Sequence, residues 1–298
     1  MPTSVRVFAP AKVNLTLHVT GRRNDGYHGL DSLVAFADVG DSLELTLSDT
    51  PSLALTGPYA DAVPSGGDNL VLKVAGHFAP APPIGITLTK NLPVASGIGG
   101  GSADAAAVFR GLTALLGADD RMDKPSDDSL QQLLPLGADI PMCVASITAR
   151  IGGIGEKVVS VSGMPVLPAV LVNPNCAVST PLVFQAMSCR ENAPMPDPLP
   201  SFSCARDLIG WLSKQRNDLE TAALQVEPEI FTVKSALAQT QNCRFVRMSG
   251  SGATCFGLFE TRRAADNAAR LLQTAHPDWW VVSTSLGSQA DGAAPQIS

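Results

Sequence analysis

The feature of this chain that most constrains its fold is the stretch LPVASGIGGGSADAAAVFRGLTALLG, which begins at Leu92. Glycine occupies four of the five positions from Gly97 to Gly101, and an alanine-rich segment with apolar residues at helical spacing follows. This pattern predicts a helix over residues 102–116 that ends before Gly117. A helix amino terminus carries unpaired N–H groups and partial positive charge, so glycines before it let an anion approach the backbone. The stretch predicts a phosphate site, and a flexible turn that caps a helix is the alternative.

Two well-known phosphate-binding motifs are excluded by the letters of this stretch. The chain has no G-x-x-x-x-G-K-[ST] sequence, and in a G-x-G-x-x-G pattern the sixth position would be Ser102. No H-R-D or D-F-G motif accompanies the glycines, which excludes a protein kinase.

Length and charge bound the class of protein. The chain has 298 residues, of which 45% are hydrophobic and 16% charged, and this predicts a folded protein with two domains. A net charge of −6 disfavours sequence-independent nucleic-acid binding, which needs clustered Lys and Arg. We therefore expect small-molecule substrates and no nucleic-acid partner.

Cysteine spacing and hydropathy indicate a cellular location. The six cysteines form no C-x-x-C pair or His-spaced cluster, so we expect reduced thiols and neither a disulfide framework nor a zinc site. The sequence MPTSVRVFAPAKVNL lacks an apolar signal core, and the longest apolar stretches are far too short to cross a bilayer. The expected location is the cytoplasm, without membrane association.

Hydrophobic periodicity predicts an α+β protein that divides near residue 150. Alternating patterns predict strands at AKVNLTLHV, LVAFADV, SLELTLS, PIGITLTK, PVLPAVLVNP, CRFVRMS and ATCFGLFE. Further helices are expected at NLVLKVAGHFA and over residues 181–187, 207–214, 228–239 and 262–275. The predicted domains are residues 1–150 and 151–286, followed by a flexible tail over 287–298.

Three segments resemble the motifs of one enzyme superfamily. PAKVNLTLHVTGRRNDGYH from Pro10, LPVASGIGGGSADAA from Leu92 and MSGSGATCFGLF from Met248 have the order and spacing of the three motifs of the GHMP small-molecule kinases. The resemblance covers nearly the whole chain. It implies a two-domain GHMP kinase fold, with an N-terminal domain like ribosomal protein S5 domain 2, a ferredoxin-like C-terminal domain and substrates in the cleft between them.

Five shorter segments resemble one branch of that superfamily: GRRNDGYH, GADIP, GGIGE, STPLVF and RNDLE. This resemblance implies ATP- and Mg²⁺-dependent phosphorylation of the 2-hydroxyl of a cytidine-diphosphate-linked methylerythritol, a step toward isoprenoid precursors. Two alternatives stay open at this point. One is another GHMP activity of the homoserine or mevalonate kinase type, and the other is a non-catalytic nucleotide-binding regulator.

The resemblance assigns the phosphoryl-transfer chemistry to a few residues. It places Asp139 beside the substrate hydroxyl as proton acceptor and Lys12 near this carboxylate, where a cation favours the charged form. Asn14 follows Lys12 by two residues, so in a strand both side chains lie on the same face and Asn14 can share the acceptor site. A cap residue, a strand-end lysine and a solvated asparagine are the respective structural alternatives.

The resemblance also implies a cytidine pocket. Tyr27 and His28 match a Tyr-His pair in which the histidine hydrogen-bonds the cytosine edge and the tyrosine packs on the base. Phe184 resembles an aromatic residue on the other face of the base, although an aromatic after a proline turn usually packs in the core. Thr180 is a hydroxyl partner for the substrate diphosphate or sugar.

The nucleotide site that the resemblance implies surrounds the glycine stretch, with Ser102 also near magnesium and the turn GSGA from Gly250 closing against the phosphates. The residues assigned to nucleotide binding are Asn69, Lys90, Pro93, Gly97, Gly99, Gly100, Gly101 and Ser102. The chain departs from the family's common G-G-G-S-S-N at Ala103 and Asp104. Asp104 is expected to point away from the phosphates or toward magnesium, and no protein ligand of magnesium is assigned. The expected assembly is a monomer or a homodimer.

Overall fold

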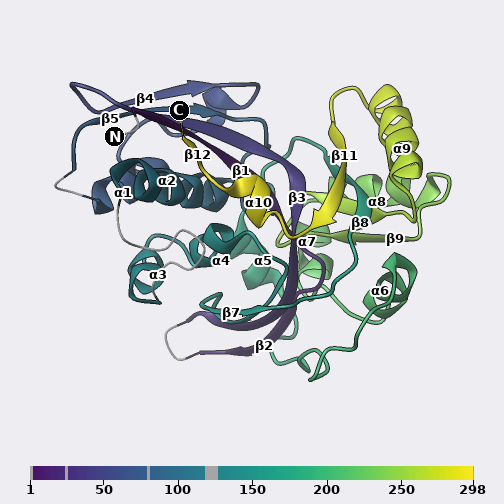
Figure 1. Ribbon diagram of the computed structural model, residues 1–298. Helices are drawn as coiled ribbons and strands as arrows, with labels where there is room; N and C mark the ends of the chain where they lie inside the picture. The colour runs from purple at the N-terminus through teal and green to yellow at the C-terminus, as the bar shows by residue number, and fades with distance from the viewer. Residues whose placement is uncertain (1–2, 24–25, 79–80, 118–126, 298) are drawn as a thin grey trace.

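The computed structural model describes residues 3–23, 26–78, 81–117 and 127–297. Its strands join in one twelve-stranded sheet whose main path is β12-β1-β3-β11-β8-β10-β9, with β2, β4, β5, β6 and β7 attached beside it (Figure 1). The strands are β1 (Ser4–Asn14), β2 (His18–Arg22), β3 (His28–Leu47), β4 (Ser52–Thr56), β5 (Ile84–Thr89), β6 (Ala149–Gly153), β7 (Lys157–Ser160), β8 (Leu167–Asn173), β9 (Phe245–Met248), β10 (Cys255–Leu258), β11 (Trp280–Gly287) and β12 (Gln296–Ile297).

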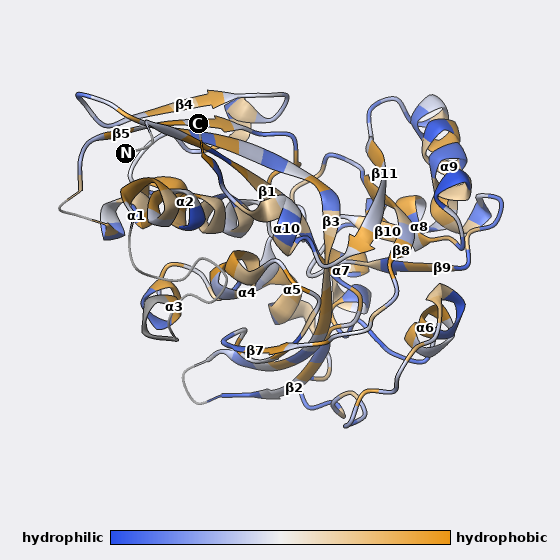
Figure 2. Cartoon of the chain, in the orientation of Figure 1, coloured by the Kyte–Doolittle hydropathy of each residue, from blue (hydrophilic) through white to orange (hydrophobic). Residues whose placement is uncertain are grey.

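Helices cover this sheet, which makes the α+β class correct. They are α1 (Leu70–His77), α2 (Gly100–Leu116), α3 (Asp127–Leu133), α4 (Ile140–Ala145), α5 (Thr180–Ala186), α6 (Ala205–Leu212), α7 (Glu220–Val226), α8 (Glu229–Gln239), α9 (Arg262–Ala275) and α10 (Ala290–Ala293), with a short 3₁₀ turn at Ala60–Ala62. Figure 2 shows α2 as apolar along most of its length, whereas α9 mixes hydrophilic and hydrophobic residues. This agrees with the burial of nearly all of α2 and the partial exposure of α9.

Strand β3 organises the fold. It spans 20 residues and pairs with β1, β2, β5, β6 and β11. The sequence had predicted two strands here, interrupted at Gly40. In the structure Gly40 lies against β1 so closely that a Cβ would stand 2.1 Å from the Ala9 carbonyl oxygen. Glycine therefore lets the strand continue where any other residue would force the two strands apart.

Three hydrophobic cores hold the elements together. The first lies between β1, β3, β5 and the helices α1, α2 and α4, and the second between β8 and the helices α5, α7, α8 and α9. A third core combines Val13 and Leu33 of the first half with Leu171 and Phe256 of the second. The two halves thus share one sheet and parts of all three cores, because Ile151 joins the first core and Leu17 and Val19 join the second. The domain boundary near residue 150 stays a prediction.

Most predicted elements are confirmed. The helix expected over 102–116 begins two residues earlier, at Gly100, and the helix predicted over 262–275 has the observed bounds. The sequence reading missed α3, α4, α7, β4, β6, β7 and β11. All six cysteines are free thiols, as expected. No helix among the described residues has the length and apolarity needed to cross a membrane.

The structure differs from the flexible tail predicted over 287–298. Residues 290–293 form α10, and β12 pairs with β1 through Val5 and Ile297. The segment is held by hydrogen bonds to backbone groups, among them Gln289 N–H to the Ser146 carbonyl at 2.8 Å. Small polar residues therefore form regular structure here because the rest of the chain offers them partners.

Candidate active site

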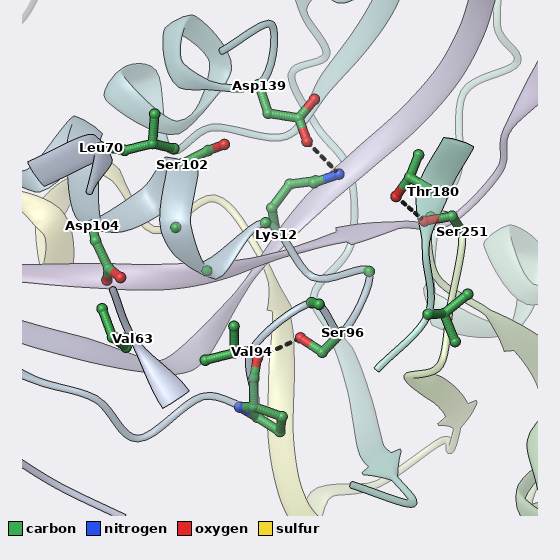
Figure 3. A pocket seen from close by; sticks show the side chains of 18 of the residues that line it. Lys12, Val63, Leu70, Val94, Ser96, Ser102, Asp104, Asp139, Thr180 and Ser251 are labelled. Atoms are coloured by element: carbon green, nitrogen blue, oxygen red, sulfur yellow. Dashed lines mark hydrogen bonds and ion pairs between the residues drawn. The ribbon is translucent and has the colours of Figure 1, made fainter. Parts of the chain in front are cut away.

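Strand β1 brings a lysine and an asparagine to the same face, as the two-residue spacing predicted. Lys12 Nζ donates to Asn14 Oδ1 at 2.8 Å and lies 3.0 Å from Asp139 Oδ2. Asp139 precedes α4 as its N-cap residue. The Lys12 side chain is only 6% exposed whereas that of Asp139 is 38% exposed, so the carboxylate is open to solvent on its far side (Figure 3). A carboxylate with one side on a cation and the other free is suited to accept a proton from a bound molecule.

The glycine stretch forms a loop that requires glycine at two positions. Gly97 (φ +76°) and Gly99 (φ +66°) have left-handed backbone conformations. A Cβ at Gly97 would lie 2.5 Å from the Ser249 carbonyl oxygen, and one at Gly99 would lie 3.0 Å from Lys12 Cε. Gly99 is the N-cap of α2, so the helix presents its first N–H groups beside Lys12 and Asp139. The predicted anion site and the predicted proton acceptor therefore adjoin.

The GSGA turn packs on this loop. Ser249 Oγ donates to the Gly97 carbonyl at 3.0 Å and accepts from the Asn14 N–H at 3.1 Å. A Cβ at Gly250 would stand 2.7 Å from the same Gly97 carbonyl oxygen. On the other side of the turn, Ser251 Oγ hydrogen-bonds Thr180 Oγ1 at 2.7 Å (Figure 3). Ser249 and Ser251 were not singled out from the sequence, although the repeated Gly-Ser letters mark their turn.

One cavity of about 520 Å³ joins these parts and draws its walls from both halves of the chain. It is lined by thirteen of the residues assigned from the sequence, namely Lys12, Asn14, Asn69, Lys90, Pro93, Gly97, Gly99, Gly100, Gly101, Ser102, Asp139, Thr180 and Phe184. Tyr27 and His28 are not among its lining residues, although His28 contacts Phe184.

Two residues of the predicted cytidine pocket, His28 and Phe184, contact each other directly. The His28 and Phe184 rings stack with their centroids 4.6 Å apart and an angle of 20° between their planes. A base placed between these two rings would have to separate them. His28 Nε2 is buried and has no hydrogen-bond partner among the described residues, and burial, with help from Arg190 and Arg22, lowers the pKa of this imidazole. Tyr27, which precedes His28 in the chain, is 60% exposed.

Lys90 is buried, whereas a lysine that contacts a nucleotide base from the surface would be exposed. Its Nζ donates to Asp41 Oδ2 and, at 2.8 Å, to Asp104 Oδ2, and all three side chains are at most 4% exposed. Burial raises the pKa of the Asp104 carboxyl to about 8, with Lys90 opposing the rise. The pKa of Lys90 is raised because the attraction of its two carboxylates outweighs the cost of burial.

This triad lies beneath the glycine loop. Lys90 Nζ would be 3.0 Å from a Cβ at Gly100. Asp41 Oδ1 accepts from the backbone N–H groups of Asn91 and Leu92, so Asp41 fixes the chain that leads into the loop. The Asp104 carboxyl thus contacts Lys90 through Oδ2, and its Oδ1 has no hydrogen-bond partner among the described residues. Sequence reasoning missed Asp41, and the only signal for it was a charged residue inside an apolar strand pattern.

Comparison with known proteins now identifies the class to which this fold and cavity belong. Residues 69–153 match the GHMP kinases N terminal domain, and residues 200–278 match the GHMP kinases C terminal domain. A solved homoserine kinase from Cytophaga hutchinsonii has the same fold, with a TM-score of 0.66 at 19% identity over 100% of this chain and 98% of its own. The chain belongs to the GHMP kinase family.

Within this family, relatives of high identity over the whole chain bear one name. The chain is 58% identical to the 4-diphosphocytidyl-2-C-methyl-D-erythritol kinase of Roseobacter denitrificans over 100% of this chain and 99% of the relative. It is 48% identical to the enzyme of that name from Ruegeria pomeroyi over 93% and 97% of the two chains. A crystal structure of 4-(cytidine 5'-diphospho)-2C-methyl-D-erythritol kinase superposes with a TM-score of 0.74 at 32% identity, covering 95% of this chain and 99% of the other. Its place in the family is therefore among the 4-diphosphocytidyl-2-C-methyl-D-erythritol kinases.

Proposed function

We propose that the protein transfers the γ-phosphoryl group of ATP to the 2-hydroxyl of 4-(cytidine 5'-diphospho)-2-C-methyl-D-erythritol in the methylerythritol phosphate pathway. The products are the 2-phosphate and ADP. The observation that carries the proposal is the Lys12–Asp139 pair, which faces the amino terminus of α2 inside a cavity of about 520 Å³. Full-length relatives that bear this enzyme's name support the choice of substrate.

The chemistry follows from this placement. The triphosphate is held by the N–H groups of Gly100, Gly101 and Ser102, where backbone donors and helix polarity favour phosphate. The substrate oxygen attacks the γ-phosphorus, the bond to the β,γ-bridging oxygen breaks, and ADP leaves. Asp139 takes the hydroxyl proton, and Lys12 stabilises charge on the oxygens that react.

The cavity also suits a magnesium ion. Mg²⁺ is usually held by one or two protein oxygens together with substrate phosphates, and the Ser102 hydroxyl lines the cavity as such an oxygen donor. When bound, the ion would neutralise phosphate charge. Among the described residues no group of three His, Cys, Asp or Glu side chains gathers to hold a metal ion by itself, which agrees with a site completed by phosphates.

The other assigned residues shape the nucleotide pocket. Asn69 caps α1 by accepting from the Val71 N–H at 2.8 Å and donates to the Pro64 carbonyl at 2.7 Å. It thereby holds a wall of the cavity near the base of ATP, and Pro93 also lines this cavity. Lys90 supports the glycine loop from below through Asp41 and Asp104. The cytoplasm is the proposed location of the protein.

An assay of ADP release tests this function. Purified protein is incubated with ATP and Mg²⁺ and with the cytidyl substrate, homoserine or mevalonate in turn, and ADP is measured by a coupled reaction. We expect turnover with the cytidyl substrate and at most background rates with the other two alcohols. Turnover with homoserine or mevalonate alone would establish the other GHMP activity, and nucleotide binding without any turnover would establish the regulator.

Substitution of His28 checks the cytidine side of the proposal. His28→Ala removes an imidazole whose Nε2 is buried without a partner, so the variant should bind the cytidyl substrate more weakly by about 1–3 kcal/mol. The Michaelis constant for ATP should not change. A rise in the ATP constant alone would mean that the two pockets are assigned in reverse.

A further inference from the structure

A buried arginine links the three elements that carry the glycine loop, Lys12 and Asp139. Arg110 lies in α2, the helix that begins at the glycine loop, and its side chain is almost fully buried. Its guanidinium donates to the Phe8 carbonyl of β1 at 2.8 Å and to the Cys143 carbonyl of α4 at 2.7 Å. β1 carries Lys12 and α4 begins directly after Asp139, so one side chain links all three parts.

The arginine makes these contacts without a carboxylate partner. Among the described residues Arg110 forms no ion pair, and burial lowers its pKa to about 10, which keeps it charged at neutral pH. Its partners are carbonyl oxygens, including Cys143 and Val144 in the last turn of α4, where the helix carries partial negative charge. Leucine or methionine could fill this space, but neither could fix the positions of three backbone segments.

The segment from Ser288 to Ala293 completes the contact on the side away from the cavity. Arg110 Nε donates to the Ala293 carbonyl at 3.0 Å, and the Gln289 N–H donates to the carbonyl of Ser146, the residue that ends α4, at 2.8 Å. Ser288 Oγ accepts from the Thr148 N–H at 3.0 Å. Figure 1 shows α10 (yellow) beside β1 and apart from α9. We call Arg110 together with residues 288–293 the brace.

We propose that the brace positions Asp139 for phosphoryl transfer by fixing the far end of α4. The inference rests on the proposed function of Asp139 as proton acceptor. α4 has only six residues, so a shift at Cys143 or Ser146 passes almost undiminished to its first turn. A displacement of about 1 Å in a reacting group can cost about 100-fold in rate. Arg110 and residues 288–293 are thus positioning residues that touch no substrate.

Two shortened chains test the segment. A chain that ends at Gly287 lacks β12 and also the hydrogen bonds of residues 288–293 to Arg110, Ser146 and Thr148. A chain that ends at Pro295 keeps these hydrogen bonds and lacks the β12 pairing with β1. Turnover is expressed per nucleotide-binding site, so that unfolded protein does not count. We expect kcat to fall about 10- to 100-fold in the first chain, with the ATP Michaelis constant within about threefold, and to stay within about twofold in the second. Equal kcat in both chains overturns the proposal.

Arg110→Lys tests the arginine of the brace, and it decides whether the brace positions Asp139 if the chain that ends at Gly287 does not fold. Lysine keeps the positive charge, but its single ammonium cannot reach carbonyls on three segments at once. We expect kcat per site to fall about 10-fold at an unchanged ATP Michaelis constant. A purely structural role would lower the melting temperature and the fraction of binding sites while leaving kcat per site unchanged, and that result would contradict the inference.

A cycle with Asp139→Asn separates this inference from the function on which it rests. If the brace acts through Asp139, Arg110→Lys should lower kcat strongly in the parent protein but less than about twofold in the Asp139→Asn background. An equal loss in both backgrounds refutes the brace while Asp139 keeps its role. Near-normal turnover of Asp139→Asn alone refutes the role of Asp139 as proton acceptor, and with it the positioning role of the brace.

Discussion

Two lysines line the same cavity and contact aspartates in very different surroundings. Lys12 lies beside Asp139, whose side chain is 38% exposed, and also donates to the amide of Asn14. Lys90 is enclosed between Asp41 and Asp104, whose side chains are 0% and 4% exposed. The first pair leaves one carboxylate free to meet a substrate. In the second group both acidic side chains contact the lysine, and Asp41 also accepts from backbone N–H groups.

This difference in exposure indicates two roles within one cavity, proton transfer at one lysine and structural support at the other. A half-exposed carboxylate can exchange a proton with a bound molecule, because water or substrate reaches it. A buried triad cannot do so, and its effect is on the free energy of unfolding and on the shape of the loop above it. We therefore expect substitutions in the Lys12–Asp139 pair to change turnover and substitutions in the triad to change stability.

The largest effect is expected from Asp139→Asn. The amide keeps the shape of the side chain but cannot take the hydroxyl proton, so kcat should fall about 10²- to 10⁴-fold. Binding of ATP, measured by titration with a fluorescent analogue, should change little because the glycine loop is intact. Turnover close to that of the parent would show that the exposed pair is not the chemical centre, and the comparison between the two lysines would fail.

The next effect concerns stability and uses matched substitutions of the two lysines. Lys90→Met leaves the buried Asp41 carboxylate and the Asp104 side chain without their cation and should lower the free energy of unfolding by about 3–5 kcal/mol. Lys12→Met should cost only about 1–2 kcal/mol, because Asp139 can be hydrated in its place. Urea unfolding of both variants measures the difference. Equal losses would mean that exposure of the partner carboxylate does not distinguish the two sites.

The placement of Lys12 beside Asn14 was more predictable from the sequence than the triad, whereas Asp139 was assigned through the family resemblance alone. Lys12 and Asn14 are two residues apart in a strand, and the strand pleat alone places them on one face. The glycine loop was visible because helix spacing starts directly after it. Asp41 and Lys90 come together only through the pairing of β3 with β5, in which Ser42 lies opposite Thr89. That register depends on packing against α2 and cannot be read from either segment alone.

The brace escaped prediction for a similar reason. Residues 287–298 are small and polar, a composition that is typical of frayed ends. Their contacts are hydrogen bonds to and from backbone groups of Ser146 and Thr148 and to the Arg110 guanidinium, and such partners leave no pattern in the sequence. An arginine within an alanine-rich helix was the one available sign, because a charge on the buried face needs acceptors.

The effect of Asp104→Asn depends on pH and is the smallest of these when it is measured over a single pH unit. Burial raises the pKa of Asp104 from 3.8 to about 8, so between these values the folded protein binds more protons than the unfolded chain. Stability from this group is therefore present at low pH and is lost as the pH rises from about 4 to about 8. The asparagine variant lacks this loss, so its unfolding free energy relative to the parent should increase with pH, by at most about 1.4 kcal/mol per unit.

Urea unfolding of the parent and of Asp104→Asn at about pH 5, 6.5 and 8 measures this trend. Asp68→Asn is the matched control, because it removes the same charge from a side chain that is 98% exposed. Its difference from the parent should stay constant across this range. If the difference for Asp104→Asn is also constant, Asp104 is charged throughout, and the triad then holds two carboxylates on one lysine in a site that water does not reach. The buried cluster would then carry a net negative charge beneath the glycine loop, which is the proposed phosphate site, and Asp104→Asn should strengthen ATP binding as well.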